Sequence, residues 1–187
     1  VAGVSGQWEV AVKKLDTGQA ASYHSNTPIV SASLYKLFVM YEVFRQRDAG
    51  TLRLDERLVI TPSAAAEDAA IGNLKFTVGS SVPISTLLDR MIAASDNTAA
   101  LTLTRRVGLD NVNRTLQTIG LTHSRLDFTN DNITTADDVA DLLERIALGH
   151  AVSRDASRQM LDLLLGQELN DLLPATLPTD VPVAHKT

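Results

Sequence analysis

The sequence places a hydroxyl and an amine one helical turn apart, at Ser33 and Lys36. Residues three apart on a helix are neighbours on its surface, so we expect these two side chains to meet. A serine hydroxyl becomes nucleophilic when a base takes its proton, and a lysine can act as that base when burial holds it neutral. The pair therefore predicts covalent catalysis by serine. The apolar residues that would bury the lysine are Leu34, Leu37, Phe38, Tyr41 and Phe44.

Two further groups of polar residues carry chemistry that would complete this pair. Ser95, Asp96 and Asn97 interrupt an apolar helical pattern. A serine hydroxyl can relay a proton, and an asparagine amide can hold a carbonyl or a lysine ammonium. Lys186 and Thr187 end a predicted strand, and their positive charge and hydroxyl suit a substrate carboxylate. The sequence thus offers a nucleophile, a base, a relay and an anion-binding pair.

Each group taken alone has an ordinary structural explanation. An isolated Ser33, or the triplet 95–97, is more often a helix cap. An isolated Lys36 is more often a solvated charge, and a Ser-x-x-Lys pattern arises by chance roughly once in a chain of ordinary composition and this size. The order and spacing of all three groups together predict the catalytic site.

Composition narrows the class of protein. The 187 residues are 44% hydrophobic and 21% charged, which is typical of a globular domain with a real core. The net charge of −5, without a lysine or arginine cluster, gives no nucleic-acid surface, and no apolar run reaches membrane-spanning length. The absence of cysteine excludes disulfides, thiolate metal sites and a cysteine nucleophile. The four histidines are scattered, so we expect chemistry by side chains alone, without metal or organic cofactor.

The order of the predicted elements favours an α+β fold. We expect a single domain over 1–187. An antiparallel sheet would be formed by the chain ends, 1–32 and 180–187, and a helical part would cover 33–179. The predicted elements are strands over 8–14, 20–24 and 181–187, an extended segment over 52–61, a loop-rich stretch over 63–79, and helices over 33–48, 84–94, 98–107, 109–119, 134–148 and 153–165.

The three motifs in this order resemble the serine β-lactamase and penicillin-binding protein superfamily, and within it the class A β-lactamase branch. Residues 33–36 match its Ser-x-x-Lys, residues 95–97 its Ser-Asp-Asn, and residues 186–187 the first two positions of its Lys-Thr-Gly. Further stretches typical of the family are 76–78, 95–99, 121–127, 134–139, 177–178 and 183–187. The resemblance therefore covers nearly the whole chain.

The resemblance implies a role for each motif residue. Ser33 would attack a lactam or amide carbonyl and become acylated, with its backbone N–H as one oxyanion donor. Lys36 would take and return the proton, and Ser95 would relay one to the leaving nitrogen. The implied substrates are β-lactams or D-alanyl-type amides.

Substrate binding would fall to the remaining motif residues. Asn97 would position Lys36 and the substrate, and Lys186 with Thr187 would hold the substrate carboxylate. The resemblance also implies a bacterial protein exported to the periplasm or secreted.

One departure from the family concerns deacylation. Class A enzymes carry a glutamate on a long loop that activates the hydrolytic water, whereas the corresponding link 128–133 is short and has no glutamate. Glu168 lies two helices later with the wrong spacing, so we interpret it as a decoy. Asp127 or Asp131 remains as a substitute base, although either is more often a loop-capping carboxylate. The alternatives to a β-lactamase are therefore a DD-peptidase or esterase, and a penicillin-binding or sensor domain that stays acylated.

The second departure concerns the chain ends. The sequence starts at Val1 without an initiator methionine or signal peptide, and it stops at Thr187 before the glycine of the third motif. We expect a longer natural protein, with the family's last strands and helix cleaved, disordered or supplied by a complementary C-terminal fragment or second chain. Without them, Trp8 and Val10 should be partly uncovered, and this chain alone should be poorly active.

Overall fold

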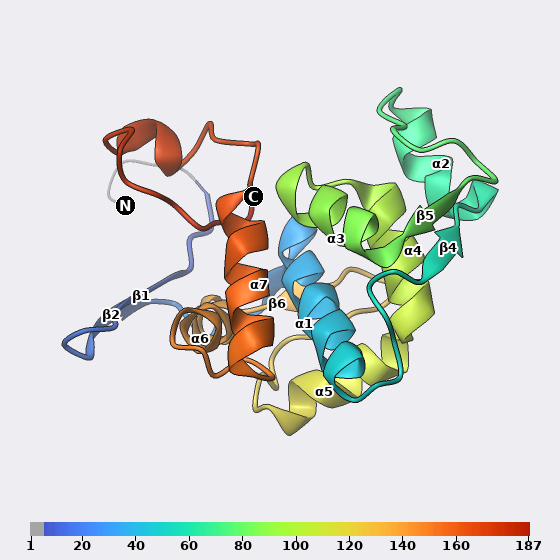
Figure 1. Ribbon diagram of the computed structural model, residues 1–187. Coiled ribbons are helices and arrows are strands. Elements are labelled where there is room, and N and C mark those ends of the chain that lie inside the picture. The colour runs from blue at the N-terminus through green and yellow to red at the C-terminus, as the bar shows by residue number, and fades with distance from the viewer. Residues whose placement is uncertain (1–5) are drawn as a thin grey trace.

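The computed structural model describes residues 6–187; the first five residues of the predicted N-terminal sheet region lie outside the described part. Its centre is helix α1 (Tyr35–Asp48), which contacts α3, α4, α5 and α7 (Figure 1). Leu37, Val39, Met40 and Val43 on this helix are 0% exposed. The helix predicted to begin at Ser33 is confirmed, and it is buried on nearly every side.

Most of the predicted helices are confirmed within two residues of their expected ends. Several begin at a polar side chain that accepts a hydrogen bond from the first turn, as Thr135 does from Asp138 N. None of the helices within residues 6–187 has both the length and the apolar character needed to cross a bilayer. The confirmed helices are α3 (Ile84–Ala93), α4 (Asn97–Val107), α5 (Leu109–Thr118), α6 (Ala136–Ala147) and α7 (Arg154–Leu165).

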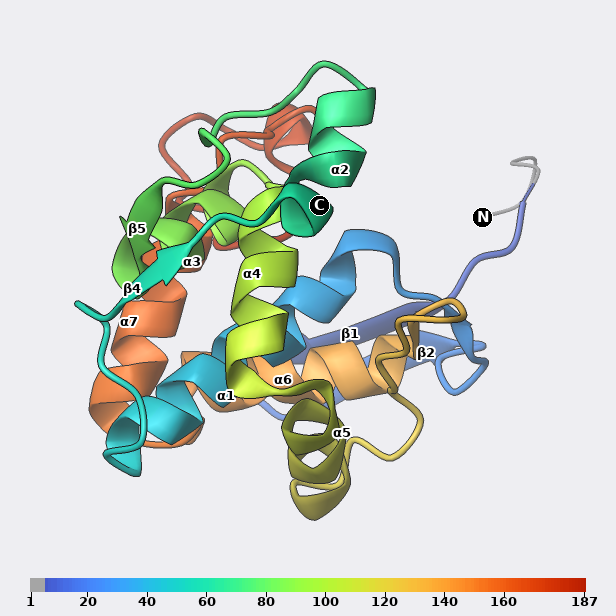
Figure 2. The same ribbon diagram turned by 90° about the vertical axis from the view of Figure 1, so that its right-hand side faces the viewer.

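The predicted loop-rich stretch over 63–79 is wrong in its first half, which forms helix α2 (Pro62–Ala70). Thr61 caps this helix by accepting from Ala64 N, and Pro62 occupies its first turn, where a missing N–H costs nothing. The alanine-rich sequence that follows has high helix propensity. Helix α2 packs on α4, at the top of the molecule in Figure 2.

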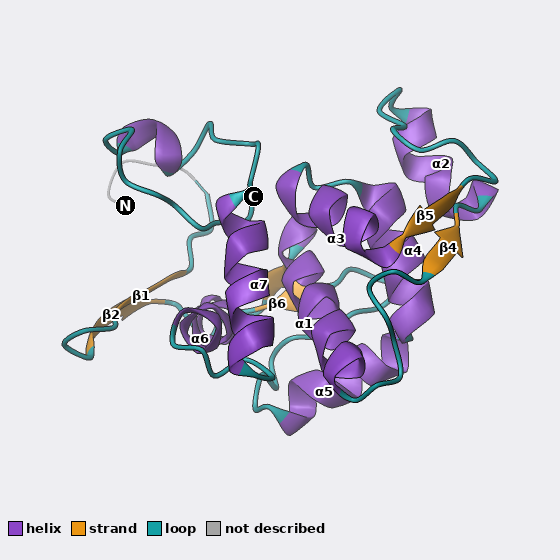
Figure 3. Cartoon of the chain, in the orientation of Figure 1, coloured by secondary structure: helices purple, strands orange, loops and turns teal. Residues whose placement is uncertain are grey.

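The strands form three separate antiparallel pairs (Figure 3). The hairpin of β1 (Val10–Lys14) and β2 (Gln19–Tyr23) is the predicted N-terminal sheet. The other strands lie among the helices, and the α+β class is confirmed. The two internal pairs are β3 (Ile29–Val30) with β6 (Ile133–Thr134), and β4 (Arg57–Val59) with β5 (Ser81–Pro83).

The predicted strand over 181–187 is not formed, so the sheet of the chain ends consists of the hairpin alone. The segment after α7 instead bonds to helix ends. Gln167 Nε2 donates to Ile92 O at 2.8 Å, Glu168 N donates to Ala93 O at 2.9 Å, and His185 N donates to Leu164 O at 3.2 Å. These bonds tie the segment to α3 and α7, and within 181–187 it is the backbone N–H of His185 that bonds to a helix end instead of a strand. A single-turn 3₁₀ helix, η2 (Pro174–Thr176), interrupts it.

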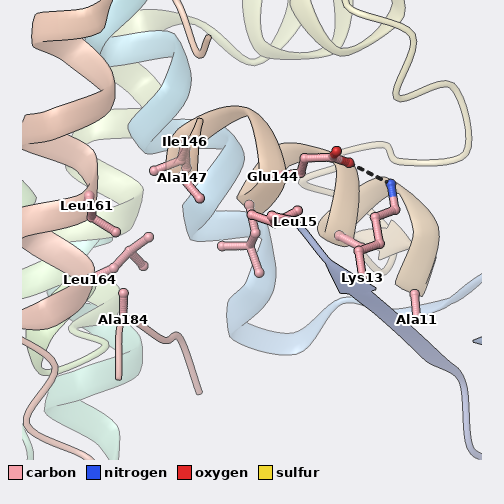
Figure 4. A pocket seen from close by; sticks show the side chains of 11 residues that line it. Ala11, Lys13, Leu15, Glu144, Ile146, Ala147, Leu161, Leu164 and Ala184 are labelled. Carbon is pink, nitrogen blue, oxygen red and sulfur yellow. Dashed lines mark hydrogen bonds and ion pairs between the residues drawn. The ribbon is translucent and has the colours of Figure 1, made fainter. Parts of the chain in front are cut away.

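An apolar groove lies between the hairpin, α6 and α7 (Figure 4). The groove has a volume of about 270 Å³, and Lys13 at its edge pairs with Glu144 at 2.9 Å. Trp8 is 43% exposed, which confirms that this residue is partly uncovered. The groove is lined by Ala11, Lys13, Leu15, Ala140, Leu143, Glu144, Ile146, Ala147, Leu161, Leu164 and Ala184, none of which is a predicted site residue.

Candidate active site

Ser33 lies in the short 3₁₀ helix η1 (Ala32–Leu34), between strand β3 and the buried helix α1. Strand β3 is held by β6, with Ile29 opposite Thr134 and Val30 opposite Ile133. Ala32, just before the serine, has φ of +43°, a left-handed conformation that is uncommon for a residue with a Cβ. Such strain persists where surrounding structure imposes it, and it concentrates at functional sites.

Ser95 lies at the sharp junction between α3 and α4, and its φ of +56° is also left-handed. Asp96 caps α4, because its Oδ1 accepts from Ala99 N at 2.7 Å. This cap fixes the direction in which α4 leaves the junction, and with it the position of Asn97 at the first turn. The polar triplet that interrupts the helical pattern is therefore both a helix cap and part of the site.

The hydroxyls and amine of the first two motifs form one connected network. Ser95 Oγ donates to Ser33 Oγ at 2.9 Å. Lys36 Nζ donates to Ser95 O at 2.5 Å, to Ser95 Oγ at 3.2 Å and to Asn97 Oδ1 at 2.6 Å. Ser33 is thus connected to Lys36 through Ser95. The sequence predicts that Ser33 and Lys36 meet directly, but no hydrogen bond joins these two side chains among the described residues.

Burial governs the charge of Lys36. The residue is 0% exposed, and loss of water lowers its pKa to about 8, although the carboxylates of Asp68, Asp96 and Glu67 oppose this by favouring the ammonium. A pKa near 8 leaves part of the population neutral at ordinary pH. Neutral lysine is the form that general-base chemistry would need.

Lys186 reaches the same serine from the last residues of the chain. Its Nζ donates to Ser95 Oγ at 2.8 Å and to the carbonyl of Thr187. Burial and the positive charge of Lys36 together lower the pKa of Lys186 to about 8. Thr187 Oγ1 is buried without a hydrogen-bond partner among residues 6–187. The third motif therefore meets the other two, with an unused hydroxyl beside an ammonium.

A polar cavity of about 380 Å³ opens beside Ser33. One wall comes from α2 and α4, and the other from the loop 127–132, which ends where β6 pairs with β3. Asn132 O accepts from Ser31 N at 2.8 Å, so this loop is bonded to the segment that carries the nucleophile. The lining residues are Val30, Ala32, Ser33, Tyr35, Glu67, Asn97, Asn130, Asp131 and Asn132.

The two candidate carboxylates of that loop, Asp127 and Asp131, have different surroundings. Asp127 is used internally, because its Oδ1 accepts from Thr129 N and Oγ1, both at 2.8 Å, and its Oδ2 accepts from Asn130 Nδ2 at 3.1 Å. Asp131 lines the cavity. Glu168 pairs with Arg90 at 3.1 Å and is not among the cavity-lining residues. Asp127 therefore has the loop-capping role, and Asp131 is the loop carboxylate beside Ser33.

Two acidic residues of α2 belong to the site although no sequence motif points to them. Glu67 Oε1 accepts from Asn97 Nδ2 at 3.0 Å. Asp68 is 1% exposed, and its Oδ2 accepts from Thr98 N at 2.7 Å and from Thr98 Oγ1 at 2.6 Å. Adjacent acids in an alanine-rich segment have no motif spacing, so only the packing of α2 on α4 reveals them. Within residues 6–187, no group of three or more His, Cys, Asp or Glu side chains could hold a metal ion.

Known proteins that are similar to this chain are β-lactamases and penicillin-binding proteins. The model of the beta-lactamase enzyme family matches residues 1–187. Beta-lactamase BRO-1 of Moraxella catarrhalis is 26% identical over 187 aligned residues, which cover 92% of this chain and 59% of the relative. The chain thus spans less than two thirds of the length of that relative.

Solved structures of similar proteins include penicillin-binding and β-lactamase examples. A mutant of PBP-A, solved as an acyl-enzyme complex with penicillin G, superposes with a TM-score of 0.87 at 27% identity, over 95% of this chain and 69% of that one. The beta-lactamase of Sphaerobacter thermophilus DSM 20745 superposes with a TM-score of 0.79 at 26% identity, over 87% and 65%. With the family model matched from end to end and the three motifs gathered at one serine, the chain belongs to the beta-lactamase enzyme family.

Proposed function

We propose that this protein is a serine hydrolase of the β-lactamase class, in which Ser33 is acylated by β-lactams. The observation that carries the proposal is the hydrogen-bonded series from Ser33 Oγ through Ser95 Oγ to Lys36 Nζ, with distances of 2.9 and 3.2 Å. A nucleophile and a base within hydrogen-bond reach of a common relay is the arrangement that activates a serine.

In the proposed acylation, the Ser33 hydroxyl gives its proton to Ser95 Oγ while the Ser95 proton passes to neutral Lys36. Ser33 Oγ forms the new bond to the lactam carbonyl carbon. Ser33 lies in the first turn of its helix, where a backbone N–H has no partner within the helix. That N–H is the proposed oxyanion donor. The C–N bond then breaks, and Ser95 returns the proton from Lys36 to the leaving nitrogen.

Lys186, Thr187 and Asn97 are the proposed substrate-binding residues. A substrate carboxylate beside Ser95 would accept from Lys186 Nζ, and Thr187 Oγ1, which is buried without a partner, would donate to it. Asn97 holds Lys36 through its oxygen, and its nitrogen is directed to the cavity carboxylate Glu67. The Asn97 amide nitrogen has a second hydrogen, which would bond the substrate amide while Asn97 Oδ1 holds Lys36.

Deacylation requires a water molecule beside the acylated Ser33. We propose Asp131 as the group that takes a proton from this water, because it is on the cavity wall while Asp127 is occupied within its loop. The water oxygen would bond to the acyl carbon as Asp131 takes one of its protons, and the bond from the acyl carbon to Ser33 Oγ would break. Ser33 Oγ would take a proton from Ser95, which the Lys36 ammonium replaces through its bond to Ser95 Oγ. The acid product would then depart, and proton exchange with solvent would restore Asp131 and Lys36. If this step is slow, the protein acts as a penicillin-binding domain.

The relatives support this choice of substrate. PBP-A is described as an acyl-enzyme with penicillin G, and BRO-1 is named a beta-lactamase. A DD-peptidase or esterase that acts on D-alanyl-type amides would use the same residues. Export to the periplasm or secretion is proposed on the same family grounds, and so is completion of the domain by a C-terminal fragment or second chain.

The proposed function is tested by hydrolysis of a chromogenic cephalosporin, followed by absorbance, with a D-Ala-D-Ala peptide and a thioester as competing substrates. We expect cephalosporin turnover that a Ser33→Ala variant loses. Turnover of the peptide or thioester without the cephalosporin would assign the protein to the DD-peptidase or esterase alternative. Equal cephalosporin turnover by the variant would overturn the assignment of Ser33.

A further inference from the structure

The cavity beside Ser33 has an acidic and amide-rich lining. Of its nine lining residues, Glu67 and Asp131 are carboxylates and Asn97, Asn130 and Asn132 are amides, and none is a lysine or arginine. The cationic side chains of the site lie elsewhere, since Lys36 and Lys186 both donate to Ser95 and neither lines the cavity. A substrate acylated by Ser33 would therefore meet positive charge near Ser95 and negative charge in the cavity.

The position of Glu67 is fixed from two sides. Helix α2 carries it, and its Oε1 accepts from Asn97 Nδ2 at 3.0 Å. Its charge acts within the site: burial raises the pKa of the neighbouring cavity residue Tyr35 to about 12, and the Glu67 carboxylate contributes to that rise. Glu67 is thus a placed negative charge on the wall of the cavity.

Asp131 supplies the second charge from a different segment of the lining. The loop that carries it is shaped at its start by the Asp127 side chain, which accepts from Thr129 N at 2.8 Å, and is held at its end by the bond from Ser31 N to Asn132 O at 2.8 Å. Both ends of this short loop are therefore constrained. A substrate side chain in the cavity would meet one carboxylate from α2 and one from this loop.

Resting on the proposed function, we propose that Glu67 and Asp131 select substrates whose acyl side chain carries a positive charge, such as an ammonium group. Among the lining amides, Asn130 would accept a hydrogen bond from the same ammonium through its oxygen, because Asn97 Oδ1 already accepts from Lys36 and Asn132 Oδ1 from Asp127 N. Both carboxylates are exposed, so their attraction is screened by water and salt. The two carboxylates therefore change the rate of Ser33 acylation among related substrates, and this difference in rate becomes smaller as ionic strength rises.

Three penicillins provide a matched probe, because they share a phenylacetyl-type acyl group and differ in its α-substituent. Ampicillin has an ammonium there, benzylpenicillin a hydrogen and carbenicillin a carboxylate. The experiment measures the second-order rate of Ser33 acylation by intact-mass spectrometry at about pH 6, where an α-amino group of pKa roughly 7.7 is protonated. We expect ampicillin to react roughly tenfold faster than carbenicillin, which corresponds to about 1.4 kcal/mol, because the partly screened carboxylates attract the ammonium and repel the carboxylate.

The variants compared are Glu67→Gln, Asp131→Asn and their combination, with Asp89→Asn as a control. Gln at position 67 keeps an oxygen for Asn97 and removes the charge. Asp89 is exposed on α3 and lines a separate depression with Phe44 and Leu54. The rate with uncharged benzylpenicillin is each variant's own reference, so differences in folding or basal reactivity cancel.

We expect the ratio of the acylation rate with ampicillin to that with carbenicillin to fall in the double variant, because its cavity lacks both carboxylates. The same ratio should stay unchanged in Asp89→Asn. The wild-type ratio should also fall at about pH 9, where the ampicillin amine is neutral. A ratio retained by the double variant, or carbenicillin reacting as fast as ampicillin with wild type, would overturn the inference and leave the proposed function standing. Failure of all three penicillins to acylate Ser33 would overturn the proposed function itself.

Discussion

Ser95 Oγ lies 2.9 Å from Ser33 Oγ, although the two residues are 62 positions apart in the chain. Ser95 also receives hydrogen bonds from Lys36 at 3.2 Å and from Lys186 at 2.8 Å. The Ser95 hydroxyl is therefore the point at which the three sequence motifs meet. In the proposed mechanism, the proton of Ser33 reaches Lys36 through this hydroxyl.

Replacement of Ser95 by alanine should slow acylation strongly, because it removes the relay while leaving Ser33 and Lys36 in place. Loss of positioned proton transfer typically costs about 10² to 10⁴ in rate. The measurement is the rate of adduct formation with benzylpenicillin by mass spectrometry. Ser85→Ala, an exposed change on α3, is the matched control. A rate for Ser95→Ala within about threefold of wild type would exclude the relay, since that difference is far below the expected general-base contribution.

The rate of acylation should be bell-shaped in pH, with its maximum near 8. Burial lowers the pKa of Lys36 to about 8, so the neutral base accumulates and the rate rises as pH increases through this value. Burial and the charge of Lys36 lower the pKa of Lys186 to about 8, so its positive charge and its hold on the substrate carboxylate are lost above it.

This pH profile is measured as the second-order acylation rate of wild type and of Lys186→Arg. Arginine stays charged throughout the range, so the variant should lose the alkaline decline and keep the acid limb. A wild-type rate that is flat between about pH 6 and pH 8 would contradict the role of Lys36 as a base of lowered pKa.

Asp68→Asn should move the acid limb of the profile to lower pH. The pKa of Lys36 is lowered by burial, and Asp68 is the foremost of the carboxylates that oppose this lowering. Loss of its charge favours neutral Lys36, so acylation at about pH 6 should become severalfold faster. The change should cost about 1 to 3 kcal/mol of unfolding free energy, because Asp68 is buried and accepts two hydrogen bonds from Thr98.

Thermal unfolding shows whether the Asp68→Asn variant is folded at the assay temperature, and Asp89→Asn controls for the change in net charge. An acid limb at unchanged or higher pH in a folded Asp68→Asn protein would contradict the electrostatic coupling between Asp68 and Lys36.

Asp131→Asn should lengthen the life of the acyl-enzyme without a comparable loss in its formation with benzylpenicillin. The proposed function assigns Asp131 to the deacylating water, and removal of a general base slows the assisted step by about 10² to 10⁴. Decay of the adduct after removal of excess benzylpenicillin is the measurement. Glu67→Gln is the comparison, because it removes the other cavity carboxylate. Equal adduct lifetimes in wild type and Asp131→Asn would contradict this role.

The helices and the hairpin could be predicted because their signals are local. Apolar periodicity and caps such as Thr135 and Ser153 depend on a few neighbouring residues. Helix α2 was missed because its alanines give no strong periodicity. The strand expected at the C-terminus was wrong, because strand pairing depends on tertiary contacts, and the backbone N–H of His185 donates to Leu164 O at the end of α7 instead.

In the candidate site, too, local patterns could be predicted and tertiary contacts could not. The structure brings together five residues that stand at recognisable motif spacing, namely Ser33, Lys36, Ser95, Asn97 and Lys186. The connection of Lys36 to Ser33 through Ser95 depends on where α4 begins, which sequence spacing does not give. The parts of Glu67 and Asp68 depend on the packing of α2 against α4.

The role of Ser33 as the nucleophile is tested by intact-mass spectrometry after excess benzylpenicillin is mixed with the protein and with Ser33→Ala. We expect a gain of one benzylpenicillin mass by the wild type, on a peptide that contains Ser33, and no gain by the variant. The same adduct on both proteins, or no adduct on a folded wild type, would contradict it.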